Sequence, residues 1–379
     1  MFRASDSALL LGLLASLGCA DQPPPLAAAD ASVRVSGEAP AGTEHEPLPY
    51  RNRQWEWIAF SGTTCRDGSP AGLSLNADTQ ATRIVLYLEG GGSCYDAETC
   101  ASNPAQVSAP FPLPFGIFDR SHPHNPVRDW TFVYVPYCSG DLHIGEADNV
   151  SVEGVDGPQL FTGRRNLVRF LERLKPTFPA AEQVLLTGVS AGGLGAILDL
   201  DLVQAFFAPV PVTMIDDSGP VLSTAHVPAC LNQRRRRYWG LDQTVLAACG
   251  GDCDPDDDFL LQAARRNVQH ARAATGFIHS NHDEVIRSFL GIATNNGLND
   301  CGGTLNLTPT APDVLEAALL DTRSQLSAAS PSFGTFFPAS TQHGWITTPA
   351  FYTQTVGGVL LVDWFGHVIA AAPAQQLGP

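Results

Sequence analysis

A serine held between glycines is the strongest chemical signal in this sequence. Gly188-Val189-Ser190-Ala191-Gly192 fits the pattern G-x-S-x-G. Residues 183–187 before it are apolar and rich in β-formers, and small residues after it pass into an apolar helical pattern. A strand, a tight turn and a helix in this order lift a serine to the apex of the turn. The two glycines suit a turn where strand and helix pass too closely for side chains. We therefore predict that Ser190 is a nucleophile.

A serine hydroxyl is a weak nucleophile at neutral pH and needs a base within hydrogen-bond reach. Histidine is the usual base, and a buried carboxylate holds it in the required tautomer. We predict His343, in a loop after an expected strand, as the base, and His367 is its competitor. Asp283 directly follows the strand expected at residues 277–280, which makes it the predicted acid. Asp217 also follows an expected strand and is the rival acid. The chain order serine, acid, histidine is that of the α/β-hydrolases.

A run of three glycines, residues 90–92, follows the apolar strand expected at residues 83–88. Backbone N–H groups of such a loop, with that of Ala191 directly after the serine, can stabilise the oxyanion of a tetrahedral intermediate. We predict that this run forms the oxyanion hole.

The elements that must position these residues alternate between strands and helices. Alternation of this kind predicts an α/β fold, with a mostly parallel central sheet flanked by helices as in the α/β-hydrolases. Ligands bind beyond the carboxyl ends of such strands, where Ser190, the glycine run, Asp283 and His343 are all expected. We expect a single catalytic domain over residues 48–372. Strands are expected at residues 54–60, 71–76, 83–88, 131–135, 183–187, 210–215, 277–280 and 332–337, and helices after the serine turn and at 164–174, 257–274, 284–292 and 313–328.

The first 47 residues are expected to lie outside that domain. Arg3 precedes an apolar stretch, residues 8–17, that is too short to span a bilayer permanently. Residues 1–19 are therefore predicted to be a signal peptide, so the protein is exported. Gly18-Cys19 ends this segment like a bacterial lipoprotein site, and a lipidated Cys19 would tether the protein to a membrane. Residues 20–47 are rich in Pro, Ala, Gly and Ser and predict a disordered linker.

Charge and cysteine content bear on other functions. The net charge of −16 argues against nucleic-acid binding, because phosphate contacts need clustered Lys and Arg. Apart from Cys19 the chain has eight cysteines, an even count that predicts up to four disulfides in an exported protein. An oxidising compartment also disfavours a zinc site at Cys249 and Cys253.

Three further clusters of charged or metal-ligating residues are not predicted to be metal sites. His279, His282 and Asp283 are expected to straddle both faces of the sheet, which does not suit a metal site. Residues 252–258 are acidic but lack the glycine and glutamate of an EF-hand loop. The arginines at 234–237 are expected to be a surface feature, which at most contacts an acidic polysaccharide. No metal or cofactor is predicted.

Several motifs follow one another in a fixed order over residues 50–365. They are Cys65-Arg66-Asp67-Gly68-Ser69-Pro70-Ala71-Gly72, the run LEGGGSC ending at Cys94, Tyr137-Cys138-Ser139-Gly140, GVSAGGLG around Ser190, Asp217-Ser218-Gly219, Asp283-Glu284 and His343. Together they resemble the pectin acetylesterase family, which also contains the animal carboxylesterase Notum. The resemblance implies Ser190, Asp283 and His343 as a catalytic triad, with oxyanion N–H groups from Gly91, Gly92 and Ala191. It also implies the disulfides Cys65–Cys138 and Cys94–Cys100, while the pairing of Cys230, Cys249, Cys253 and Cys301 stays open.

The expected function is that of an exported serine carboxylesterase that removes O-acyl groups, above all O-acetyl groups, from a polysaccharide without a cofactor. Three alternatives stay open. The acyl chain could be longer, as in the Notum branch, or a sugar hydroxyl could replace water in an acyltransferase. A catalytically idle surface protein that binds glycans through the same cleft is the alternative from another class.

Overall fold

Nine strands form the central sheet. They are β1 (Glu56–Thr64), β2 (Pro70–Asn76), β3 (Arg83–Leu88), β4 (Thr131–Val135), β7 (Gln183–Val189), β8 (Val212–Asp217), β9 (Thr275–Ile278), β10 (Phe333–Phe336) and β13 (Gln376–Leu377). In this computed structural model, which describes residues 46–108, 110–294 and 308–379, their order is β1-β2-β4-β3-β7-β8-β9-β10-β13. Neighbours from β4 to β13 pair in parallel, whereas β2 is antiparallel to β1 and β4. The predicted α/β architecture with a mostly parallel sheet is confirmed, and it is consistent with the α/β-hydrolase fold.

The central strands are apolar throughout because both faces of the sheet are covered. In β3, Val85 and Tyr87 belong to one buried cluster, and Ile84, Leu86 and Leu88 belong to another. Successive side chains of a strand point to opposite faces, so the two clusters are the two sides of the core.

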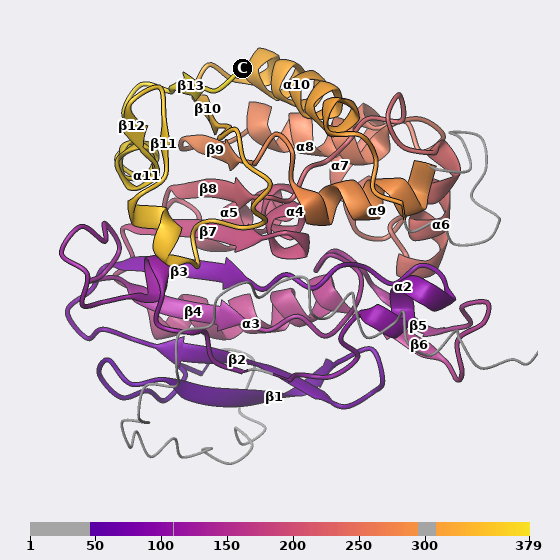
Figure 1. Ribbon diagram of the computed structural model, residues 1–379. Coiled ribbons are helices and arrows are strands. Elements are labelled where there is room, and N and C mark those ends of the chain that lie inside the picture. The colour runs from indigo at the N-terminus through magenta and orange to yellow at the C-terminus, as the bar shows by residue number, and fades with distance from the viewer. Residues whose placement is uncertain (1–45, 109, 295–307) are drawn as a thin grey trace, which may run out of the picture. The chain divides into compact units, whose positions relative to one another are not determined.

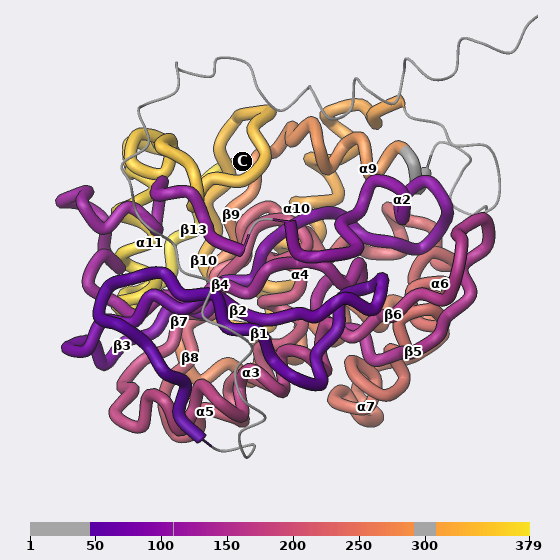
Figure 2. The backbone as a smooth tube through the Cα atoms, turned by 90° about the horizontal axis from the view of Figure 1, so that it is seen from below, coloured from indigo at the N-terminus to yellow at the C-terminus, as the bar shows by residue number. Residues whose placement is uncertain are grey.

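Helices cover one face, and shorter elements with one helix cover the other. Figure 2, viewed from the β1 edge, shows α3 (Gly163–Thr177) and α5 (Leu200–Phe207) below the strands and α11 (Leu361–Ile369) above them. The helical side also holds α4 (Ala191–Leu198), α8 (Phe259–Gln269) and α10 (Pro312–Ala329), and the other side holds the 3-10 turns η1 (Gly116–Phe118) and η3 (Pro349–Tyr352).

Further elements gather beyond the carboxyl ends of the strands. In Figure 1 the arrowhead of β3 points to the right, toward α2 (Ala97–Ser102), α6 (Ala229–Trp239) and α9 (Glu284–Thr294). The hairpin of β5 (Ala147–Val150) and β6 (Gln159–Phe161) lies there too. The remaining elements are α7 (Val245–Cys249), η2 (Gly250–Asp252) and the hairpin of β11 (Thr355–Val356) and β12 (Val359–Leu360). This is the edge at which the sequence places the reactive residues.

Most predicted elements are confirmed, and β3 and β4 have the predicted bounds. The helix expected at residues 257–274 is wrong at its end, because α8 stops at Gln269 and residues 270–274 lead into β9. Neither α6 nor α11 is predicted. Strand β13 lies a few residues beyond the expected domain end at 372.

The expected signal peptide (1–19), Cys19, Cys301 and nearly all of the expected linker (20–47) lie outside the described residues. Within residues 46–108, 110–294 and 308–379, no helix combines the length and apolar character that a bilayer span requires.

Disulfide bonds link loops near the carboxyl ends of the sheet strands. Cys65–Cys138 and Cys94–Cys100 are both formed, as the resemblance implies. Cys249 is bonded to Cys253, and Cys230 is also in a disulfide. These bonds suit an oxidising compartment.

Candidate active site

Ser190 stands at a sharp turn between β7 and α4. Its backbone has φ 59° and ψ −121°, a conformation that residues other than glycine rarely adopt. A Cβ on Gly192 would lie 1.9 Å from the carbonyl oxygen of Leu88, and one on Gly188 would lie 2.5 Å from it. The predicted close passage of strand and helix is confirmed for Gly188, whose Cβ would also lie 2.5 Å from the Gly192 backbone, whereas Gly192 is constrained by the end of β3.

His343 and Asp283 form a buried hydrogen-bonded pair. The His343 Nδ1 lies 2.8 Å from Asp283 Oδ2, so the ring donates through Nδ1 to the carboxylate and leaves Nε2 for another partner. Asp283 is fully buried, and its Oδ1 accepts hydrogen bonds of 2.9 Å from the N–H groups of Val285 and Ile286 at the start of α9. The helix therefore fixes the carboxylate, and the carboxylate fixes the imidazole.

The loop that carries His343 lies against the turn that carries Ser190. A Cβ on Gly344 would lie only 2.8 Å from Val189 Cγ1, so the residue after the histidine contacts the residue before the serine. The Gly344 N–H donates to Ser218 Oγ at 3.1 Å. The Ser190 turn and the His343–Asp283 pair thus come from three distant parts of the chain and lie at the same edge of the sheet.

Asp217, the rival acid, makes no hydrogen bond to the His343 ring. It connects the Ser190 turn to the segment that follows His343. Its carbonyl oxygen accepts the Ser190 N–H at 2.8 Å. Its Oδ2 accepts the N–H groups of Trp345 and Ile346 at 2.7 and 2.8 Å, and Ser218 donates to Oδ1. Burial raises the pKa of this carboxyl to about 6, against the lowering effect of these donors. We therefore assign Asp217 to positioning of the site.

The glycine run lies beside the serine. A Cβ on Gly90 would lie 3.0 Å from the Ser190 Cβ. The Gly91 carbonyl accepts a hydrogen bond of 2.7 Å from Asn103 Nδ2, and the Gly92 carbonyl accepts one of 3.0 Å from the Tyr137 hydroxyl. Because a trans peptide directs its C=O and N–H in opposite directions, these bonds orient the N–H groups of Gly92 and the next residue. Ala191 is the first residue of α4, where N–H groups have no partner within the helix.

Two disulfide-linked loops support the glycine run. Asn103 follows α2, which the Cys94–Cys100 disulfide joins to the end of the run. The Arg66 guanidinium donates through Nη2 to the carbonyls of Cys100 and Asn103, both at 2.8 Å. Arg66 in turn follows Cys65, which is bonded to Cys138. The two predicted disulfides therefore hold the residues that orient the run.

Two buried residues next to the run are not identified by the sequence. Glu89 precedes Gly90, and its Oε2 accepts the Tyr137 N–H at 2.8 Å. Burial raises the pKa of this carboxyl. The His143 Nε2 lies 2.8 Å from the Glu89 carbonyl oxygen, so it carries the proton that is donated. His143 is therefore bonded to the backbone before the glycine run, and its position before the serine in the chain also departs from the order serine, acid, histidine.

The other candidate residues lie apart from the serine or have other partners. His279 is fully buried, with Nδ1 2.7 Å from the Ser280 carbonyl oxygen, whereas His282 Nε2 lies 3.4 Å from Glu316 Oε2. His367 is exposed on α11. In the described part of the chain, no three His, Cys, Asp or Glu residues are grouped so as to hold a metal ion.

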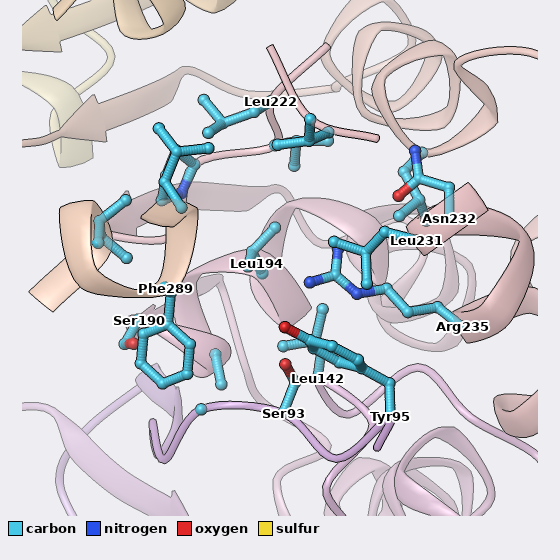
Figure 3. A pocket seen from close by; sticks show the side chains of 18 residues that line it. Ser93, Tyr95, Leu142, Ser190, Leu194, Leu222, Leu231, Asn232, Arg235 and Phe289 are labelled. Atoms are coloured by element: carbon cyan, nitrogen blue, oxygen red, sulfur yellow. The ribbon is translucent and has the colours of Figure 1, made fainter. Parts of the chain in front are cut away.

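A mostly apolar cavity of about 110 Å³ opens beside Ser190 (Figure 3). Its walls come from α4, α6, α8, α9, the loop after β8, the loop between β3 and α2, and Leu142 of the loop after β4. Arg235 of α6 extends into this cavity from the side opposite Ser190, so the interpretation of residues 234–237 as a surface feature is wrong for Arg235. Helical periodicity explains this, since Leu231, Arg235 and Trp239 follow at intervals of four on one face of α6. The apolar side chains of the lining are Leu142, Leu194, Val221, Leu222, Val227, Leu231, Leu260, Ile286, Phe289 and Leu290.

Comparison with known proteins agrees with this geometry. Residues 57–249, just over half of the chain, match the family described as pectinacetylesterase. The chain belongs to the pectinacetylesterase family. The matched segment contains Ser190 and the glycine run, whereas Asp283 and His343 lie beyond it. Their pairing is therefore an observation of the structure alone.

Two relatives share the name palmitoleoyl-protein carboxylesterase NOTUM. The Drosophila melanogaster protein is 29% identical over 210 residues, which cover 50% of this chain and 31% of that protein. The Homo sapiens protein is 33% identical over 177 residues, which cover 42% of this chain and 34% of that protein. The match thus spans about a third of the length of these curated relatives.

Proposed function

We propose that this pectinacetylesterase-family protein is a serine carboxylesterase. Ser190 Oγ attacks the ester carbonyl while His343 Nε2 takes its proton, and Asp283 holds the imidazole in the tautomer this requires. The N–H groups of Gly91, Gly92 and Ala191 stabilise the oxyanion. The alcohol leaves with the proton from His343, and water, activated by the same histidine, releases the acid from the acyl-serine.

One observation carries the proposal. The His343–Asp283 pair, 2.8 Å apart, lies on a loop that packs against the strained Ser190 turn. A buried carboxylate bonded to Nδ1 is the arrangement that prepares the opposite ring nitrogen to accept a proton.

The lining of the cavity favours an acyl chain longer than acetyl. Each buried methylene contributes about 0.8 kcal/mol, which corresponds to roughly fourfold in kcat/KM when the contact forms in the transition state. An acetyl group would contact few of the leucine, valine and phenylalanine side chains of the wall. The names of the NOTUM relatives, which act on a palmitoleoyl protein, favour the same choice over the polysaccharide acetate expected from the sequence.

Hydrolysis of 4-nitrophenyl acetate and 4-nitrophenyl octanoate tests the proposal. Ser190→Ala should lower kcat by about 10⁴-fold or more, whereas the exposed Ser121→Ala should leave it unchanged. The octanoate should exceed the acetate by at least about tenfold in kcat/KM. Absence of nitrophenol release from both esters would favour the non-catalytic glycan-binding alternative. A product that carries the acyl group on an added sugar would instead identify an acyltransferase.

Export is part of the proposal. Residues 1–19 would direct the chain out of the cytoplasm and into an oxidising compartment, in which its disulfides can form. A lipid on Cys19 would tether the domain to the outer envelope. Incorporation of labelled palmitate that is lost in Cys19→Ser tests the tether, and an unlabelled, released protein would argue for a plain signal peptide.

A further inference from the structure

The cavity beside Ser190 has a polar end that its apolar walls do not explain. Arg235 and Tyr95 point into the cavity from the side opposite Ser190, and Ser93 and Asn232 lie at the same end (Figure 3). Arginine is a donor only, and hydroxyl and amide groups can all donate. Among the described residues that line the cavity there is no aspartate or glutamate. This end of the cavity therefore combines one cation with three groups that can donate, and its described lining holds no carboxylate.

The Arg235 guanidinium is held by aromatic rings instead of a carboxylate. Its Cζ lies 5.2 Å from the ring centroid of Tyr95 and 5.6 Å from that of Trp239. The buried Nε has no hydrogen-bond partner among the described residues. Asp96, which acts on Arg235 through space, caps α2 by accepting from Thr99 and lies 3.9 Å from Arg234. The rings thus orient the cation, and among the described residues no carboxylate forms an ion pair with it.

Asn232 also places a buried donor at this end of the cavity. Its side chain is only 2% exposed, and its Nδ2 also has no hydrogen-bond partner among the described residues. Burial raises the pKa of the Tyr95 hydroxyl to about 12, so this group keeps its proton at neutral pH. Buried donors without acceptors are unfavourable, and an acceptor-rich ligand group would remove that cost.

We propose that the acyl chain which occupies this cavity ends in a carboxylate, bound by Arg235 with Asn232 and Tyr95. This inference rests on the proposed esterase function and specifies its substrate. With the ester carbonyl at Ser190, the chain runs along Leu194 and the other apolar walls toward the guanidinium. A planar carboxylate can accept two parallel hydrogen bonds from the guanidinium, whereas a terminal methyl group would leave the cation unpaired. Arg235 is then a specificity-determining residue for monoesters of dicarboxylic acids.

The test uses two esters with the same number of carbons. 4-Nitrophenyl octanoate ends in a methyl group, and mono-4-nitrophenyl octanedioate ends in a carboxylate. The wild-type protein should prefer the octanedioate by about 10- to 100-fold in kcat/KM, the effect expected of a charged hydrogen-bonded pair. Hexanedioate and decanedioate monoesters, each beside its monocarboxylic counterpart, identify the chain length at which the preference is largest.

Variants assign the preference to Arg235. Arg235→Met should remove most of the octanedioate activity and leave octanoate hydrolysis within about threefold. Arg236→Met is the matched control, because Arg236 lies on the same helix, is ion-paired with Asp242 at 2.8 Å and does not line the cavity. It should change neither activity. Equal use of both esters by the wild-type protein, or an equal loss of both in Arg235→Met, would overturn the proposal.

Arg235 could instead bind an anion on the alcohol side of the ester. If Arg235→Met impairs hydrolysis of an acetyl ester of galacturonic acid but not of the octanedioate, the anion belongs to the alcohol and the proposal is wrong. If the wild-type protein hydrolyses no ester, the proposed function fails. The binding of octanedioate and octanoate to the cavity then tests the carboxylate site separately. Calorimetry with Ser190→Ala should then show octanedioate bound at least about tenfold more tightly than octanoate, and Arg235→Met should abolish the difference. Equal affinities would contradict it.

Discussion

The carbonyl oxygen of Asp217 lies 2.8 Å from the backbone nitrogen of Ser190, so the end of β8 holds the turn at the end of β7. The carboxylate of the same residue accepts two N–H groups from the segment after His343. One buried aspartate therefore joins the predicted nucleophile to the loop that carries the predicted base.

Replacement of Asp217 tests this positioning role. Asp217→Ala would leave the Trp345 and Ile346 N–H groups and the Ser218 hydroxyl without their acceptor, and we expect a loss of about 3 kcal/mol or more in the free energy of unfolding. Displacement of the His343 loop should also lower kcat by about 10- to 100-fold with little change in KM. Asp217→Asn keeps an oxygen and should lose less of both. A destabilised Asp217→Ala protein with wild-type kcat well below its unfolding temperature would refute the positioning role.

Replacement by asparagine should affect kcat differently at Asp283 and at Asp217. Asp283→Asn keeps an oxygen that can cap α9, but its amide cannot stabilise the imidazolium or hold the required tautomer. We expect kcat to fall by about 10⁴-fold with nearly unchanged stability. The exposed Asp313→Asn at the start of α10 serves as the control. If Asp217→Asn lowers kcat as much as Asp283→Asn, the assignment of the acid is wrong.

The glycine run depends on Asn103 for its orientation. Asn103→Leu removes the donor to the Gly91 carbonyl, so the Gly92 N–H loses its fixed direction. We expect kcat to decrease by about tenfold to 10²-fold with KM nearly unchanged, since an oxyanion donor acts mainly in the transition state. Ser102→Ala, at the neighbouring exposed position, should leave kcat unchanged. An increase in KM alone would indicate a ground-state role for Asn103.

Continuous apolar runs made the central strands predictable. Residues 83–88 and 131–135 are buried on both faces, so their sequences contain little except apolar residues. Helix α6 was missed because the arginines at 234–237 interrupt its apolar pattern. Alanines at 271, 273 and 274 extended a predicted helix, but pairing of β9 with β8 and β10 outweighs their helical preference.

The nucleophile could be predicted from local sequence, whereas the acid could not be decided in the same way. The turn is encoded in the five consecutive residues from Gly188 to Gly192, although the space that these glycines leave is taken in part by the distant Leu88 carbonyl. Asp217 and Asp283 each follow a parallel strand, and only the three-dimensional course of the His343 loop distinguishes them. The hydrogen bonds that Tyr137 and His143 make to Gly92 and Glu89 join residues about 50 positions apart, and the local sequence does not reveal them.

His143 predicts a specific dependence of stability on pH. Burial lowers the pKa of its imidazole from 6.5 to about 4 in the folded protein. Between these values the unfolded chain binds a proton that the folded protein excludes, so this group reduces stability as the pH falls from 6.5 toward 4. The slope is about 1.4 kcal/mol per pH unit for one proton.

His143→Gln isolates this contribution, because its amide N–H can still donate to the Glu89 carbonyl but does not titrate. Buried His279 and the carboxyls of raised pKa, such as Asp217, contribute equally in both proteins and cancel in the difference. Urea unfolding at several pH values should show a constant difference above pH 7, and a relative gain for the variant of about 1.4 kcal/mol per unit below about pH 6. The exposed His367→Gln should follow the wild-type curve throughout. Parallel curves for His143→Gln and the wild-type protein would show that the His143 imidazole is not held neutral by the fold.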